Sequence, residues 1–246
     1  MTIKGQRVAI VTGASKGIGR AIALQLAKDG IAVLVNYSTS PGAAAAVVAE
    51  IEAGGGKAVA VQADISSPSA AADLFNAAEG GFGSVDILVN NAGILKLAPL
   101  AETDDASFEQ QIAINLTGTF RAMREAARRL RDGGRIINFS SSVVGAYGPT
   151  YGVYAASKAA VEAMTHVASK ELGRRDITVN AVAPGPVETE LFMTGKSDEL
   201  VERIVGTIPL GRLGRPDDIA SVVSFLASPE AGWVNGQVLR ANGGMI

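Results

Sequence analysis

The sequence has no cysteine and a single histidine, His166, among its 246 residues. It therefore has no disulfide, no thiol nucleophile and no zinc site made of histidine and cysteine, and we expect no metal. No apolar run approaches the ~20 residues that a membrane-spanning helix needs. The 22 basic and 24 acidic residues give a net charge of −2, without the basic excess of nucleic-acid-binding proteins. We expect a cytoplasmic protein that binds neither nucleic acid nor membrane.

The rest of the composition is that of a folded α/β protein. Hydrophobic residues make up 48% of the chain and charged residues 19%, close to the averages of globular proteins. Short apolar segments, which predict strands, alternate with longer segments that predict helices. The predicted strands are residues 7–12, 32–36, 58–62, 87–89, 135–140, 178–183 and 237–240, and the predicted helices are residues 18–29, 43–53, 69–79, 105–130, 154–172 and 216–226.

This alternation predicts a single domain over residues 1–246, with one doubly wound parallel sheet of about seven strands and helices on both faces. Most connections are short. The exception runs over residues 186–211, and long connections in compact domains are often binding loops. We therefore expect this segment to form a lid over a substrate.

A glycine-rich turn joins the first predicted strand to the first predicted helix. Its glycines are Gly13, Gly17 and Gly19, with the spacing G-x-x-x-G-x-G. Glycine permits a tight turn, and a helix N-terminus offers free N–H groups to a phosphate. In this position the turn predicts a dinucleotide site, with Ser15, Lys16 and Ile18 as further contacts.

The same turn also fits the nucleophile motif G-x-S-x-G of hydrolases, with Ser15 as the nucleophile. A hydrolase would need a base, and the only histidine, His166, falls inside the predicted helix 154–172. A serine hydrolase is the first alternative reading. A regulator that binds NADP(H) without turnover is the second.

The end of the second strand favours NADP(H) over NAD(H). An NAD site usually has an acidic residue there to bind the ribose 2′-hydroxyl, but residues 35–40 read Val-Asn-Tyr-Ser-Thr-Ser. The 2′-phosphate of NADP carries a charge of about −2, and Lys16 and the hydroxyls of residues 38–40 could bind it. We expect Asn36, Tyr37 and Ser38 to contact the cofactor.

Tyr154 and Lys158 lie four residues apart at the start of a predicted helix, so both side chains share one face. The phenol of tyrosine has a pKa of about 10. An ammonium ~4 Å away would interact with a phenolate by about 4 kcal/mol at an effective dielectric constant of ~20. That interaction would lower the pKa of Tyr154 by up to ~3 units, which would make it a useful acid and base.

Several motifs occur in a fixed order along the chain. They are residues 12–19, Asn-Asn-Ala-Gly at 90–93, Ser-Ser-Ser-Val-Val-Gly at 140–145, Tyr154 with Lys158, and Pro-Gly at 184–185. With these motifs the sequence resembles the short-chain dehydrogenase/reductase family over essentially its whole length. It is most similar to 3-oxoacyl-acyl-carrier-protein-reductase-like members, including Gly-Arg-Leu-Gly at 211–214 and Asn-Gly-Gly-Met at 242–245.

The resemblance implies a Rossmann-like fold and a homotetramer or a dimer. It also implies reversible reduction of a ketone or other carbonyl to a secondary alcohol by hydride transfer from NADP(H). Tyr154 would be the general acid, Lys158 would lower its pKa and bind the nicotinamide ribose, and Asn115 would hold a proton-relay water.

The resemblance also implies a serine that donates a hydrogen bond to the carbonyl oxygen. Ser142 precedes Val-Val-Gly as that serine does in the family, although it lies 12 residues before Tyr154. Ser141 lies at the usual spacing of 13 residues. Neighbouring strand residues point to opposite faces, so only one of them can serve. We favour Ser142, on the assumption of a one-residue loop deletion.

Further cofactor contacts are implied at the ends of later strands. Those expected near the adenine are Asp64 and Ile65, those lining the ribose are Asn90, Ala92 and Gly93, and those near the nicotinamide are Pro184, Gly185, Val187 and Thr189. For Asp64, capping of the following turn is an alternative role.

The sequence leaves the substrate open between a 3-oxoacyl thioester and a small or apolar ketone. A carrier-bound thioester would need basic residues at the rim of the site, and the candidates are Arg128, Arg129, Arg131, Arg174 and Arg175. Apolar side chains at residues 191–193, together with Tyr147 and Tyr151, favour an apolar or aromatic carbonyl.

Overall fold

Seven strands form one sheet in the computed structural model, which describes residues 5–246 and leaves the first four residues of the predicted domain outside the description. The strands are β1 Val8–Val11, β2 Ala32–Tyr37, β3 Ala58–Gln62, β4 Ile87–Asn90, β5 Arg135–Phe139, β6 Thr178–Pro184 and β7 Val238–Ala241. Their order is β3-β2-β1-β4-β5-β6-β7, and each strand runs parallel to its neighbours. The predicted seven-stranded parallel sheet is confirmed.

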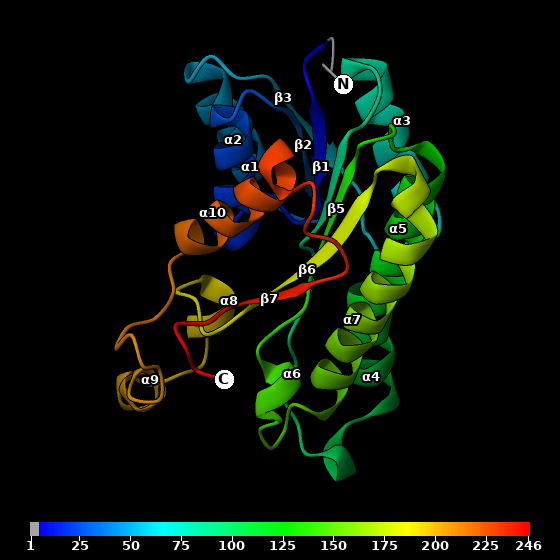
Figure 1. Cartoon of the computed structure of the whole chain (residues 1–246). Helices are drawn as coiled ribbons and strands as arrows, with labels where there is room; N and C mark the ends of the chain where they lie inside the picture. The colour runs from blue at the N-terminus through cyan, green and yellow to red at the C-terminus, as the bar shows by residue number, and fades with distance from the viewer. Residues whose placement is uncertain (1–4) are drawn as a thin grey trace.

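Helices cover both faces of this sheet (Figure 1). The α-helices are α1 Gly17–Lys28, α2 Pro41–Ala53, α3 Ala70–Phe82, α4 Asp105–Ile112, α5 Thr119–Arg129, α6 Val143–Ala146, α7 Gly152–Leu172, α8 Glu190–Met193, α9 Asp198–Val205 and α10 Pro216–Ala227. Helices α1, α2 and α10 lie on one side and α3, α5 and α7 on the other, as a doubly wound sheet requires.

The central strands are buried on both faces, which explains their nearly continuous apolar sequence. In β1, Ala9 and Val11 pack with Ile22 and Val223 in one core, whereas Val8 and Ile10 belong to the core on the opposite face. Each fully buried aliphatic side chain contributes about 1.5–3 kcal/mol relative to an exposed one. Alternation along the strand therefore anchors both helical layers to the same sheet.

Strands β2 and β3 lie on one side of β1, whereas β4 and the later strands lie on its other side. The strand order therefore reverses between β1 and β4, which are neighbours in the sheet. Doubly wound folds bind ligands in the crevice at the carboxyl ends of such strands. Helices α6 and α8, which follow β5 and β6, lie at this end of the sheet in the lower part of Figure 1. The fold thus places the glycine turn and the residues that follow β4, β5 and β6 at one edge.

One helix that was predicted as continuous is interrupted in the structure. The predicted helix 105–130 is divided into α4, a π-helical segment at Ala113–Gly118, and α5. A π-helical turn inserts an extra residue into the helix and often occurs at a functional site. The other predicted helices match the observed ones with ends shifted by three residues or fewer.

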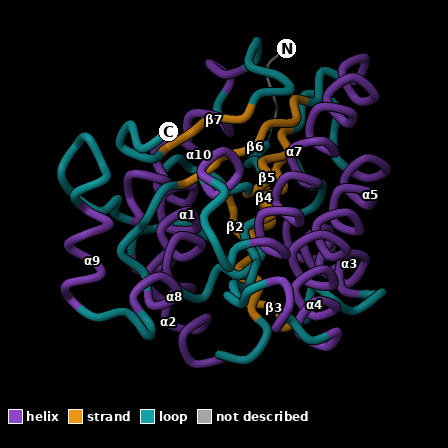
Figure 2. Tube along the Cα trace, turned by 90° about the horizontal axis from the view of Figure 1, so that it is seen from below, coloured by secondary structure: helices purple, strands orange, loops and turns teal. Residues whose placement is uncertain are grey.

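The long connection contains two short helices, of which α9 matches a helix predicted at residues 198–205 and α8 was not predicted. Helices α8 and α9 each begin with a side-chain cap. The Thr189 hydroxyl accepts from the Phe192 N–H, and the Ser197 hydroxyl accepts from the Leu200 N–H. Figure 2 shows α9 set apart from the sheet, on the side of α1 and α10.

Within residues 5–246, no helix has both the length and the apolar character to cross a bilayer.

Candidate active site

The glycine turn after β1 packs directly against the segment after β4. Gly13 and Gly17 have φ angles of +63° and +56°, which glycine adopts without strain. A Cβ atom on Gly19 would lie 2.3 Å from the Gly13 carbonyl oxygen and 2.5 Å from Asn91 Nδ2. Asn91 Nδ2 itself donates to the carbonyl oxygens of Thr12 and Gly13, at 2.9 and 3.1 Å. Glycine is therefore required here by both conformation and space.

Thr12 and Asn91 hold the ends of β1 and β4 together, a role that the sequence did not reveal. The buried Thr12 hydroxyl donates to the Val89 carbonyl oxygen and accepts from the backbone N–H groups of Asn91 and Ala92, both at 3.0 Å. These bonds fix the carboxyl ends of β1 and β4 relative to each other. A hydroxyl directly after a buried strand at the reversal point is the signal that could have identified Thr12.

The start of α1 has the free donors that a pyrophosphate needs. Lys16 is the N-cap and gives the helix no side-chain cap. Within the described residues, the backbone N–H groups of Gly17, Ile18 and Gly19 have no protein acceptor. The half-buried Ser15 lies beside them. Unpaired donors at the positive end of a helix dipole fit an anionic phosphate group.

Asn36 has a structural role, and its predicted contact with the cofactor stays a prediction. Its side chain is 2% exposed. Its Oδ1 accepts from the Gly13 N–H at 3.1 Å, and its Nδ2 donates to the carbonyl oxygens of Val61 and Ala63. The side chain is thus occupied in joining the ends of β1, β2 and β3. Tyr37 is half-buried, and Ser38 is exposed directly after β2.

Asn90 also has a structural role, and its predicted contact with the ribose stays a prediction. Its Nδ2 donates to Asn138 Oδ1 at 2.8 Å between β4 and β5, and the side chain is 3% exposed. The exposed Asp64 accepts from the N–H and the hydroxyl of Ser66, so it caps the turn after β3. Ile65 is buried against Gly118 of the π-helical segment. Adenine contacts from Asp64 and Ile65 stay predictions.

Lys158 is a buried cation with few partners. It is 4% exposed, and its Nζ donates to the Phe139 carbonyl oxygen at 2.8 Å. Burial lowers the pKa of Lys158 to about 8. A Cβ on Gly93 would lie 3.6 Å from this Nζ, so the ammonium faces the turn after β4. An ammonium has three donors, and the two that remain fit the hydroxyls of a ribose.

The expectation that Lys158 lowers the pKa of Tyr154 is wrong for this structure. Burial raises the pKa of Tyr154 to about 12, opposed by a hydrogen bond with Ser141 and reinforced by Tyr151. Lys158 Nζ lies 5.7 Å from the centre of the Tyr154 ring and bonds to the Phe139 carbonyl oxygen instead. The phenol is therefore protonated at neutral pH.

The surroundings of the two serines favour Ser141 over the predicted Ser142. The side chain of Ser141 lowers the pKa of Tyr154, against the effect of burial. Ser142 is 4% exposed, donates to the Ala183 carbonyl oxygen at 3.2 Å and accepts from Asn242 Nδ2 at 3.0 Å. Its hydroxyl therefore joins the turn after β5 to the ends of β6 and β7 and is turned away from Tyr154.

Asn115 lies in the π-helical segment and is fully buried. Its Oδ1 accepts from the Ile94 N–H at 2.8 Å, and its Nδ2 donates to the Ile94 carbonyl oxygen at 2.9 Å. A Cβ on Gly93 would lie 3.2 Å from this Oδ1. The side chain thus fixes the segment that faces Lys158, and the predicted proton-relay water stays a prediction.

The segment that follows β6 rests on the glycine turn. Pro184 ends β6, and a Cβ on Gly185 would lie 2.8 Å from the Cα of Asn242. Val187 is buried and pairs with Gly214. The Thr189 methyl would lie 3.5 Å from a Cβ on Gly17. These residues therefore occupy the edge of the sheet where the resemblance placed the nicotinamide.

The serine hydrolase reading finds no support in the geometry. His166 is exposed, and its Nδ1 would lie 3.9 Å from a Cβ on Gly236, just before β7 begins. Ser15 follows the carboxyl end of β1. The strands are parallel, so the two residues lie at opposite edges of the sheet and cannot act together.

The arginines predicted to line the rim also lie at the amino edge. Arg131 pairs with Asp86, directly before β4, and Arg175, before β6, pairs with Asp132. Arg129 is engaged by Glu79. These cations are therefore far from the carboxyl edge and have acidic partners of their own.

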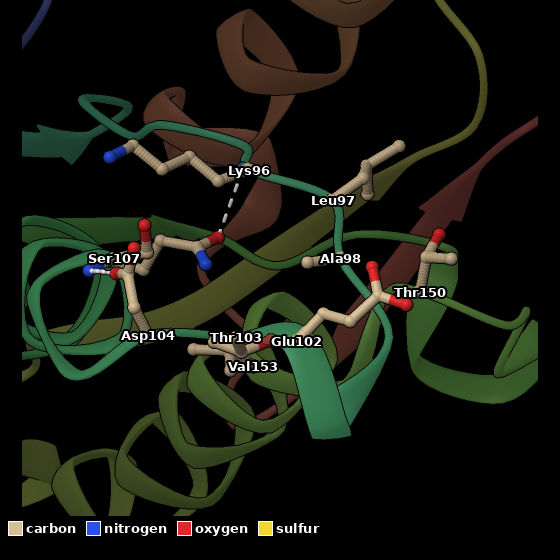
Figure 3. Close-up of a pocket in the computed structure, with 10 residues that line it drawn as sticks. Lys96, Leu97, Ala98, Glu102, Thr103, Asp104, Ser107, Thr150 and Val153 are labelled. Carbon is tan, nitrogen blue, oxygen red and sulfur yellow. Dashed lines mark hydrogen bonds between the residues drawn. The ribbon is translucent and has the colours of Figure 1, made fainter.

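A cavity of about 210 Å³ adjoins the site (Figure 3). Its walls are Lys96, Leu97, Ala98, Glu102, Thr103, Asp104, Ser107, Gln111, Thr150 and Val153. Val153 directly precedes Tyr154, and the Lys96 N–H donates to Gln111 Oε1 at 3.1 Å. The cavity therefore lies beside the proposed catalytic side chains without containing any of them.

Comparison with known proteins identifies the family. Residues 13–246 match a family model described as "Enoyl-(Acyl carrier protein) reductase". The chain is 48% identical to a "Short-chain type dehydrogenase/reductase" of Picea abies, over 98% of this chain and 93% of the relative. The chain belongs to the short-chain dehydrogenase/reductase family.

Other members of the short-chain dehydrogenase/reductase family match at similar coverage. "NADPH-dependent aldehyde reductase 2, chloroplastic" of Arabidopsis thaliana is 48% identical over 98% of this chain and 94% of the relative. The solved structure of "angucycline C-6 ketoreductase LanV with bound NADP" superposes with a TM-score of 0.92 at 38% identity, covering 97% of this chain and 95% of that one. The predicted family and fold are confirmed, and the protein is an oxidoreductase of this family.

Proposed function

We propose that this protein reduces a carbonyl compound to an alcohol with NADPH, in a reversible reaction. The observation that carries the proposal is the arrangement at the carboxyl edge. The side chain of Ser141 acts on the pKa of Tyr154, and the buried Lys158 turns its ammonium towards the segment after β4. The donors at the start of α1 lie at the same edge.

Each side chain has a role that its surroundings support. NADPH, when bound, would supply the hydride. Tyr154 is protonated at neutral pH because burial raises its pKa to about 12, so it can donate its proton to the carbonyl oxygen. Ser141 would donate a hydrogen bond to the same oxygen. Lys158 would bind the ribose hydroxyls with the two ammonium donors that the Phe139 carbonyl oxygen leaves free.

The preference for NADP(H) rests on the end of β2. No carboxylate lies between residues 36 and 40, and Lys16 is the exposed cation of the glycine turn. A carboxylate at that strand end would repel a 2′-phosphate. The Arabidopsis relative is named for NADPH, and the LanV structure contains NADP, which agrees with this preference.

For the substrate we favour an apolar or aromatic ketone or aldehyde over a carrier-bound 3-oxoacyl thioester. The arginines that would bind a carrier lie at the amino edge. By contrast, Tyr147 and Tyr151 line a cavity of about 300 Å³ at the start of α7, together with Gly148, Gly152, Ala155, Ala156 and Ala159. Residues 186–211 are proposed as the lid. Assembly as a homotetramer and a cytoplasmic location stay predictions.

The test is NADPH oxidation with a panel of apolar ketones, aromatic ketones and aldehydes, for the native protein and for Tyr154→Phe. The native protein should turn over members of the panel. Tyr154→Phe should lose at least about 100-fold in kcat, the lower range for a general acid, while it still binds NADPH. Turnover that survives in Tyr154→Phe would refute the assigned role.

A further inference from the structure

An ion pair joins the glycine turn to the lid segment. Lys16, the N-cap of α1, and Glu190, the first residue of α8, bring Nζ and Oε2 to 2.7 Å. The two side chains are 63% and 71% exposed. Next to them the Thr189 methyl lies over Gly17. The start of α8 therefore sits on the start of α1, with this pair at its outer edge.

Lys16 is also the cation best placed for a cofactor phosphate. The next cation in α1, Arg20, is already paired with Glu50, and residues 32–40 contain no lysine or arginine. A 2′-phosphate at the end of β2 would thus depend on Lys16, whose charge Glu190 neutralises in the structure. Exposed ion pairs are weak because both partners are well hydrated. A phosphate of charge about −2 should therefore displace the carboxylate.

We propose that Glu190 is a specificity-determining residue, which competes with the 2′-phosphate of NADP(H) for Lys16 and so reduces the preference for NADP(H) over NAD(H). The inference rests on the proposed function, in which Lys16 binds that phosphate. NAD(H) has a hydroxyl at this position and leaves the ion pair intact. NADP(H) binding, in contrast, has to break the pair and leave the Glu190 carboxylate close to a second anion.

The test measures the dissociation constants of NADPH and NADH by cofactor fluorescence. Glu190→Gln should tighten NADPH by about two- to fivefold, and fivefold corresponds to roughly 1 kcal/mol. NADH should be unchanged. The matched control is Glu188→Gln, which removes a carboxylate on the same segment. Glu188 is exposed and forms no ion pair among residues 5–246, so its loss should alter neither constant.

A double-mutant cycle with Lys16→Ala completes the design. Lys16→Ala should weaken NADPH and spare NADH, and adding Glu190→Gln to it should change nothing further. The inference is overturned if Glu190→Gln leaves NADPH unchanged, tightens NADH equally, or still acts without Lys16. If Lys16→Ala retains the native preference for NADPH, the inference falls while the proposed function stands. If the native protein binds neither cofactor, the proposed function itself fails.

Discussion

Gly19→Ala tests whether the glycine turn is built as the structure shows. The added Cβ would lie 2.3 Å from the Gly13 carbonyl oxygen, 2.5 Å from Asn91 Nδ2 and 3.0 Å from the Cα of Ala14. None of these atoms can move independently, because the Asn91 amide holds the carbonyl oxygens of Thr12 and Gly13. Relief of the contact therefore has to move the turn or break these bonds.

The size of the effect follows from three contributions. Overpacking costs about 1–3 kcal/mol, and losing the two Asn91 hydrogen bonds costs about 0.5–1.5 kcal/mol each. Alanine in place of glycine inside a helix returns ~1 kcal/mol. We expect the free energy of unfolding to fall by about 1–5 kcal/mol, and NADPH binding to weaken because the donors of the turn are displaced.

The assay is urea unfolding followed by circular dichroism, together with an NADPH titration of the folded variant. The control is Gly80→Ala in α3, where no atom lies within 4 Å of the added Cβ. This control should be stabilised by up to ~1 kcal/mol and should bind NADPH normally. The reasoning is refuted if Gly19→Ala behaves like Gly80→Ala in both measurements.

Two further predictions concern the catalytic edge. Ser141→Ala should lower kcat by about 100-fold or more. Ser142→Ala should change kcat little and lower the free energy of unfolding by ~1 kcal/mol. Steady-state kinetics and urea unfolding of both variants check this, and the reverse pattern would restore Ser142 as the catalytic serine. Lys158→Met should raise the free energy of unfolding at pH 7 by at most roughly 3 kcal/mol, because burial lowers the pKa of Lys158 to about 8 against about 10.4 in an unfolded chain. Between pH 8 and pH 10 the unfolded chain binds more protons than the folded one. The native protein therefore gains stability with rising pH, and the advantage of Lys158→Met shrinks. If urea unfolding shows a constant difference in the free energy of unfolding between the variant and the native protein over this range, the burial of a charged Lys158 is contradicted.

The sheet and its reversal point were predictable because local signals agree there. Val8 and Ile10 are apolar for one core, and Ala9 and Val11 for the other, so a strand buried on both faces reads as an unbroken apolar run. Gly13 and Gly17 follow at once with positive φ angles. A turn that only glycine adopts easily is visible in sequence as the glycine itself.

The details of the site depend on packing that the sequence does not display. The π-helical turn around Asn115 adds one residue to a helix without changing its composition. What distinguishes Ser142 from Ser141 is contact with distant segments, because the Ser142 hydroxyl bonds to the Ala183 carbonyl oxygen and to Asn242. The pKa of Tyr154 follows from burial more than from its spacing to Lys158.

Contacts between distant segments could not be predicted from the sequence for a different reason. Lys16 and Glu190 meet only because the segment that follows β6 folds back over the start of α1. In the sequence Asn36 is a polar residue at the end of a strand. Its amide is occupied by hydrogen bonds to the backbone at the ends of β1 and β3, which only the fold brings together. Residue types indicated a cofactor site, but the role of each residue in it follows from contacts between segments that are distant in the sequence.

The central claim is that the carboxyl edge of this sheet binds a phosphorylated nicotinamide cofactor. Titration of the native protein with NADPH and with NADH, followed by cofactor fluorescence, tests it most directly. We expect saturable binding of both cofactors, with a lower dissociation constant for NADPH. Tighter binding of NADH, or no binding of either cofactor, would contradict it.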